Sequence, residues 1–212
     1  MPIWGEYRIT WRQVLPPVAV VVAGTALLLT LRSCGDDRHD VNLREQREVY
    51  RLQLQNPEPG MVAQAVRRLG EIGEAEDVER LRPFLDREEP RVVGAALEAL
   101  GRLGDATAKE KILEGLRSGE PDIAAGAASG AGALRLAEAT EPLSKLLSSR
   151  HFDVRLAAIQ ALGAIGDAKA IGALEGLEAK PAAGLRGEPT NDERAALAEA
   201  VAKALASLRG AQ

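Results

Sequence analysis

Few side chains in this 212-residue sequence are of the types that catalyse reactions or bind metals. Two histidines, His39 and His151, lie far apart in the sequence, and Cys34 is the single cysteine. No group of cysteines and histidines has the spacing of a zinc site, and one cysteine cannot form an internal disulfide. We therefore interpret both histidines as solvent-facing loop residues and expect no catalytic residue, no metal and no cofactor.

A glycine-rich stretch, GAASGAG from Gly126, is a second candidate for chemistry. Gly130 and Gly132 form a G-x-G pair, but the next glycine of a dinucleotide-binding loop would fall on Arg135, and no strand precedes the stretch. Glycine also costs a helix interior ~1 kcal/mol relative to alanine. Gly132 belongs instead to a series with 31-residue steps, which consists of Gly70, Gly101, Gly132 and Gly163. The glycines indicate a structural repeat and not a phosphate site.

Regularly spaced glutamates are a third candidate, because they could form a surface that binds a partner. Glu79, Glu110 and Glu141 are 31 residues apart, so stacked repeats would align them in an acidic row. Such a row could bind a basic or polar segment of another protein, although a solvated helix face of mixed charge has the same appearance. The six candidate partner-binding residues are Glu76, Glu79, Glu110, Glu114, Glu138 and Glu141.

The element that must position these residues is a 31-residue repeat. The segments LGEIG, LGRLG, AGALR and LGAIG begin at Leu69, Leu100, Ala131 and Leu162. Apolar residues before and within each segment keep to one helical face, which predicts a first helix. A second apolar series, which predicts a second helix after a tight turn, consists of Leu81, Ile112, Leu143 and Leu174. Such pairs bury their apolar faces by stacking, so we predict an all-α fold, an α-solenoid.

The period sets the expected boundaries. We place the four helix-pair repeats near residues 57–89, 90–120, 121–150 and 151–179. A helix from residue 42 caps the first repeat. Residues 180–191, rich in proline and glycine, form a loop, and a capping helix at 191–208 follows. Its inward stripe consists of Leu197, Val201, Leu205 and Leu208. Residues 42–208 thus form one elongated domain.

The turn between the two helices has its own pattern. We expect Gly73, Gly104 and Gly166 to end first helices in the left-handed conformation, and Asp105 and Asp167 to begin second helices. Close backbone approach is expected at the small-residue column of Ala75, Ala106, Ala137 and Ala168.

The third repeat differs from the others. Gly126 and Gly130 replace alanines of the neighbouring repeats, which weakens a helix by ~2 kcal/mol at exposed positions. This predicts a flexible joint, unless the repeat has simply drifted towards small residues.

The segment DVRLAAIQALGAIGDAKAIGALEGL, residues 153–177, resembles the short HEAT-like repeat of bacterial proteins, a type also found in phycobilin lyases. The resemblance covers roughly residues 57–177 and implies a protein-binding solenoid in most members and bilin attachment in a minority. We therefore expect a scaffold without enzymatic activity that binds an unidentified protein through the second-helix, concave face. A phycobilin-lyase-like enzyme or enzyme subunit is the alternative. The HEAT-like hydroxylases that bind iron carry His-Glu pairs, which neither histidine of this chain provides.

The composition argues against nucleic acid as a partner. The net charge is -4 and aromatic residues make up only 3% of the sequence. A basic face with aromatic residues would be expected for a nucleic-acid-binding solenoid.

Residues 14–31 form an apolar run without a charged residue. As a helix the run would span roughly 27 Å, close to the thickness of a bilayer core. Trp4 and Trp11 lie in the flank 1–13, as is typical of a membrane interface. We predict a single-pass transmembrane helix followed by a juxtamembrane linker at 32–41. An export signal and a buried core helix are the alternatives.

Cys34 bears on how the chain is anchored. The sequence LRSC, residues 31–34, resembles the lipobox of bacterial lipoproteins, from which Arg32 departs, and makes Cys34 a candidate lipidation site. We expect a location in the bacterial inner membrane with the repeats outside the cytoplasm, and a lipoprotein is the alternative.

Overall fold

The structure is a computed structural model that describes residues 42–210. These residues divide at Arg47: residues 42–46 belong to a unit that begins at Met1, and residues 47–210 belong to a second unit, here called the repeat unit. The flank 1–13, the apolar segment 14–31 and the linker 32–41 with Cys34 lie outside the described residues. Within 42–210, none of the helices combines the length and the apolarity needed to span a bilayer.

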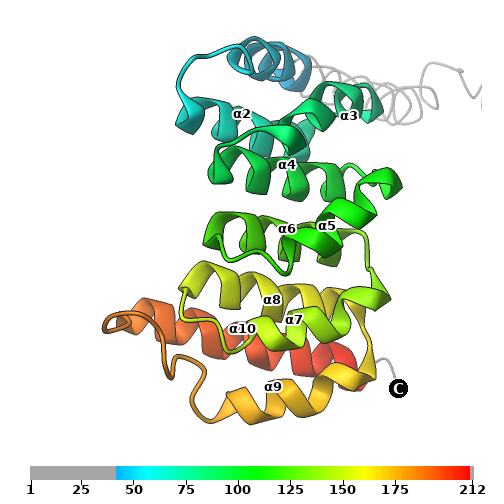
Figure 1. Cartoon of the computed structure of the whole chain (residues 1–212). Helices are drawn as coiled ribbons and strands as arrows, with labels where there is room; N and C mark the ends of the chain where they lie inside the picture. The colour runs from blue at the N-terminus through cyan, green and yellow to red at the C-terminus, as the bar shows by residue number, and fades with distance from the viewer. Residues whose placement is uncertain (1–41, 211–212) are drawn as a thin grey trace, which may run out of the picture. The chain divides into compact units, whose positions relative to one another are not determined.

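Helices stack in two layers in the repeat unit (Figure 1). The first-helix layer consists of α2 (Pro59–Ile72), α4 (Pro90–Arg102), α6 (Pro121–Ala133), α8 (Phe152–Ile165) and α10 (Asn191–Gly210). The second-helix layer consists of α3 (Ala75–Leu81), α5 (Lys109–Gly115), α7 (Thr140–Leu146) and α9 (Ile171–Glu178). Short 3-10 turns adjoin the second helices at η2 (Arg82–Asp86), η3 (Ala106–Ala108), η4 (Ala137–Ala139) and η5 (Ala168–Ala170). Residues 42–53 are also helical, and residues 47–53 of this helix, here called the cap segment, belong to the repeat unit.

Proline sets the start of the first helices. Pro59, Pro90 and Pro121 occupy the first turn of α2, α4 and α6 at 31-residue steps, where the missing N–H leaves no hydrogen bond unmade. Pro83 acts differently, because α3 ends at Leu81 and the chain continues as the 3-10 turn that contains this proline.

The ends of the first helices confirm part of the predicted turn. Gly104 and Gly166 have φ of 78° and 81°, the left-handed conformation that glycine adopts without strain. The equivalent residue of the third repeat is Arg135, which holds φ 50° despite its side chain. The prediction for Gly73 was wrong: its φ is -72°, because the chain there passes directly into the capping box of α3. A Cβ at Gly73 would lie 2.1 Å from the Leu69 carbonyl oxygen, so close approach requires this glycine.

Aspartates begin two of the second helices, as predicted. Asp105 accepts a hydrogen bond from the Thr107 N–H at 3.0 Å, and Asp167 accepts one from the Lys169 N–H at 3.0 Å. Each bond caps a 3-10 turn that leads into the α-helix.

The apolar columns form one continuous core. The columns of both helices are fully buried, namely Leu69, Leu100, Ala131 and Leu162 in the first and Leu81, Ile112, Leu143 and Leu174 in the second. The predicted stripe of α10 is also buried, at Leu197, Val201, Leu205 and Leu208. A Cβ on Gly163 would meet the Ala204 Cα at 3.0 Å, so α10 packs on α8 as a further first helix.

The predicted close-approach column of alanines was wrong by two residues. Ala75, Ala106, Ala137 and Ala168 are exposed. The buried small residues are Ala108, Ala139 and Ala170. In the second to fourth repeats a 3-10 turn precedes the α-helix, which shifts the inward-facing position along the chain.

Glycines bring neighbouring first helices into backbone contact. A Cβ on Gly101 would lie 2.4 Å from the Gly130 Cα, and a Cβ on Gly126 would lie 2.0 Å from the Gly94 carbonyl oxygen. Both contacts join α4 to α6. Gly126 and Gly130 therefore serve this close packing, while the flexible joint that the sequence suggested here stays a prediction.

A buried arginine fixes the loop between α9 and α10. Arg155 of α8 is 2% exposed, and its burial lowers the pKa of its guanidinium. The guanidinium donates to the carbonyl oxygens of Ser149 (2.6 Å), Pro181 (2.7 Å) and Ala183 (2.9 Å). These bonds hold residues 181–183 against the start of α8.

Candidate functional site

The six predicted glutamates all lie exposed on the second-helix layer. Glu76 and Glu79 are on α3, and Glu110 and Glu114 are on α5. Glu138 lies in η4 and Glu141 on α7. The 31-residue register thus places Glu79, Glu110 and Glu141 at one position of three successive second helices.

Basic neighbours partly neutralise this acidic row. Within single second-helix segments, Arg82 donates to Glu79 at 2.5 Å and Lys145 to Glu141 at 2.7 Å. Lys109 of the second repeat reaches Glu138 of the third at 2.7 Å, and this bond lowers the pKa of Glu138.

Two of the six glutamates keep their full charge. Glu76 lies 3.9 Å from Arg51, but within residues 42–210 neither Glu110 nor Glu114 forms an ion pair. The least compensated negative charge of the row therefore lies on α5.

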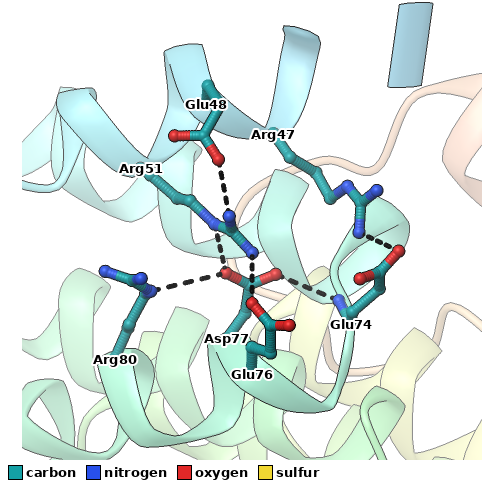
Figure 2. Close-up of polar contacts among 7 residues, drawn as sticks. All are labelled: Arg47, Glu48, Arg51, Glu74, Glu76, Asp77 and Arg80. Atoms are coloured by element: carbon teal, nitrogen blue, oxygen red, sulfur yellow. Dashed lines mark hydrogen bonds and ion pairs between the residues drawn. The ribbon is translucent and has the colours of Figure 1, made fainter. Parts of the chain in front are cut away.

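The sequence analysis missed a buried carboxylate, Asp77, at the N-terminal end of the repeats. Asp77 is 0% exposed, and Figure 2 shows it at the centre of a cluster of charged side chains. Nε of Arg51, from the cap segment, donates to Oδ1 at 2.6 Å. The backbone N–H of Glu74 donates to Oδ2 at 3.0 Å, and Arg80 lies 4.0 Å from Oδ1. Both oxygens of Asp77 therefore have partners.

A second arginine of the cap segment completes the cluster. Arg47 forms an ion pair with Glu74, the residue that caps α3, and Arg51 also binds Glu48 at 2.6 Å (Figure 2). Tyr50 and Leu54 pack on the core beside these pairs. Two ion pairs and two apolar side chains thus fasten the cap segment to the first repeat.

Hydrogen bonding determines the charge of Asp77. Burial raises its pKa, but the hydrogen bonds from Arg51 and the Glu74 N–H, together with the charges of Arg51 and Arg47, outweigh burial and leave the pKa below its ordinary value. The same contact raises the pKa of Arg51. The pair is therefore ionised at neutral pH, and its role is structural.

A similar bridge joins the first repeat to the second. Arg82, which lies 31 residues after Arg51, donates to both carboxylate oxygens of Asp105 at 2.9 and 3.0 Å. The hydrogen bond from Arg82 is the largest cause that lowers the pKa of Asp105 to about 2.

Alignment at 31 residues could have revealed Asp77. Its counterparts are Ala108, Ala139 and Ala170, all buried, so a carboxylate interrupts a column of small residues. Such an interruption indicates a charged partner from outside the repeat. The register of Arg51 and Arg82 points to that partner.

The part of the chain that the structure describes offers little for metal chemistry. Across residues 42–210, no three His, Cys, Asp or Glu side chains are arranged to hold a metal ion. His151 is half-buried at the N-cap position of α8, and His39 lies outside the described residues.

Comparison with known proteins identifies the repeats. Two overlapping segments, residues 49–129 and 110–189, match the family profile described as HEAT repeats. The chain belongs to the HEAT-repeat family. Among solved structures, this HEAT-repeat chain is similar to the crystal structure of an engineered protein from the Northeast Structural Genomics Consortium. The TM-score is 0.50 at 21% identity, with 77% of this chain and 79% of the engineered chain covered. This likeness shows the fold alone, and a search of curated proteins gives no match.

Proposed function

We propose that the chain is a membrane-tethered HEAT-repeat scaffold that binds another protein through its second-helix face, the face expected to be concave. One observation carries the proposal: Glu79, Glu110 and Glu141 are all exposed at one register of three successive second helices. A partner segment with basic or polar side chains at matching intervals would complement this row. The scaffold has no catalytic role of its own in this proposal.

The tether in this proposal is residues 14–31, whose apolar composition fits a bilayer core. The repeats then lie on the outer side of a bacterial inner membrane. Extraction of membranes at alkaline pH checks the tether, since an integral anchor keeps the chain in the pellet. Intact mass distinguishes the lipoprotein alternative, which predicts a diacylglyceryl group on an N-terminal Cys34.

Charge reversal tests the binding face. In the triple variant Glu79→Lys/Glu110→Lys/Glu141→Lys, we expect partners crosslinked in native membranes to be lost, because like charges would then face each other. The matched control is Glu88→Lys/Glu120→Lys/Glu188→Lys, which changes the net charge equally at exposed positions outside the second helices. Circular dichroism checks that both variants fold. Undiminished crosslinking in the first variant would reject the second-helix face as the binding surface.

A further inference from the structure

The first-helix layer, opposite the acidic row, contains a groove that the proposed function does not use. Two hollows of about 490 and 590 Å³ lie on this layer. Both are lined by Leu156 and Gln160 of α8, so they adjoin each other. The first extends over α6 and the second extends to α10. We call the two hollows together the first-layer groove.

The groove exists because side chains shorten along the layer. At one register, α2 and α4 carry Arg67 and Glu98, which form an ion pair at 3.5 Å. The next two first helices carry Ser129 and Gln160 at this register. Large charged side chains thus cover the layer over the first two repeats, and the surface is open over the third and fourth.

The half of the groove between α8 and α10 is apolar. Leu156 lies half-buried in its lining, and alanines of α10 face it across the hollow. The lining alanines are Ala164, Ala196, Ala200 and Ala204. Their small size leaves room for larger apolar side chains of a ligand, whose burial contributes about 25 cal/mol per Å².

The half of the groove over α6 has an acidic rim. Asp122 and Asp153 lie 31 residues apart, in the first turns of α6 and α8, and both line the hollow. Asp122 is 43% exposed at its side chain and only approaches Arg91, at 3.9 Å. In the described part of the chain, Asp153 forms no ion pair. Phe152 lines the hollow beside them and offers an aromatic ring to a cation.

We propose that the first-layer groove binds a basic amphipathic segment of a partner protein. The apolar side chains of the segment pack on Leu156 and the alanines of α10. A lysine or arginine near one end of the segment pairs with Asp122 and Asp153. The charge of the rim and the apolar lining select this occupant, because an acidic segment would meet two like charges. The site is independent of the acidic row on the other layer.

Peptide display on the full chain tests the proposal. The chain is presented in nanodiscs of phosphatidylcholine, and binders to empty nanodiscs are removed first. We expect enriched peptides to combine bulky apolar residues with lysine or arginine at one end. A synthetic peptide of the enriched sequence, labelled with fluorescein, then serves as the probe for anisotropy titrations.

Three variants locate the peptide. Asp122→Asn/Asp153→Asn keeps the size of both side chains, and we expect about tenfold weaker binding, because the rim loses its charge. Gln160→Trp fills the boundary between the two hollows from an exposed position and should abolish binding. The control is Glu79→Lys/Glu110→Lys/Glu141→Lys, which should bind the peptide with unchanged affinity. Thermal unfolding by circular dichroism confirms that each variant folds.

The alternative results are distinct. Enriched peptides without basic residues, or affinity unchanged in both groove variants, would overturn the proposal. Peptide binding that is lost only in the glutamate variant would also overturn it, while supporting the second-helix face as the binding surface.

Discussion

The contact of the cap segment with the first repeat and the contact of α4 with α6 fill one repeat architecture with opposite materials. The first relies on charge, with Arg51 of the cap segment bonded to the buried Asp77. The second relies on the absence of side chains, with Gly101 and Gly126 set against the backbone of the neighbouring helix. A shared 31-residue register therefore fixes where helices meet, and the residues at the contact decide which conditions it withstands.

The difference follows from position. At the end of the stack a long arginine side chain can reach a carboxylate while part of it remains near solvent, which reduces the cost of desolvation. Between two first helices there is no room for such a side chain. Close packing of backbone atoms depends on shape and hardly on pH or salt.

Removal of Asp77 should give the largest effect. Asp77→Ala leaves Arg51 without its carboxylate and removes the capping bond to the Glu74 N–H, so we expect a loss of about 3 kcal/mol at this end of the repeats. Hydrogen exchange should become faster in the cap segment and α3, with little change in α6. The double variant Asp77→Ala/Arg51→Ala is the control. If the two losses simply add, the ion pair does not couple these elements.

A methyl group at Gly101 should give a somewhat smaller loss. The added Cβ of Gly101→Ala would lie 2.4 Å from the Gly130 Cα, and backbone must move to relieve the overlap. We expect a loss of about 2 kcal/mol in urea unfolding, together with faster hydrogen exchange in α4 and α6. Gly176→Ala on α9 is the matched control, because no neighbouring atom lies within 4 Å of its added Cβ. This variant should gain up to about 1 kcal/mol from helix propensity.

The same exchange data address the flexible joint. If α6 in the unmodified chain is protected as well as α4 and α8, the glycines of α6 serve close packing alone. Faster exchange confined to α6 would support the joint.

The sequence was sufficient to predict the helix pairs, because burial of an apolar face repeats with the same period as the chain. It was not sufficient for the turn. The 3-10 segments move the buried position from Ala106 to Ala108, and Gly73 adopts an extended conformation because the next helix begins at once.

The candidate site was predictable only in part. Exposure of the six glutamates follows from the helical pattern, but their compensation does not. The bond of Lys109 to Glu138 joins residues 29 positions apart and depends on how two repeats stack. Asp77 has the composition of a surface residue, and its burial depends on Arg51, which lies in a segment outside the four repeats. A prediction from periodicity alone therefore misses interactions between unlike segments.

Acid should separate the two contacts, with the smallest of the expected effects. The pKa of Asp105 is about 2 in the folded chain against an ordinary 3.8, and that of Asp77 is also lowered. Stabilisation by these carboxylates is complete above their unfolded pKa and is lost as the pH falls through the folded value, between about pH 4 and pH 2.

For Asp105, whose side chain is 3% exposed, the shift corresponds to at most about 2 kcal/mol. Hydrogen exchange at pH 5 and at pH 2.5, corrected for the intrinsic rates, should show opening at the cap segment, α3 and η3 before the interior of α6. The contact of α4 with α6 is made by glycine backbone and has no titrating group at Gly94, Gly101, Gly126 or Gly130. Equal loss of protection at both contacts would mean that charge is not what distinguishes them.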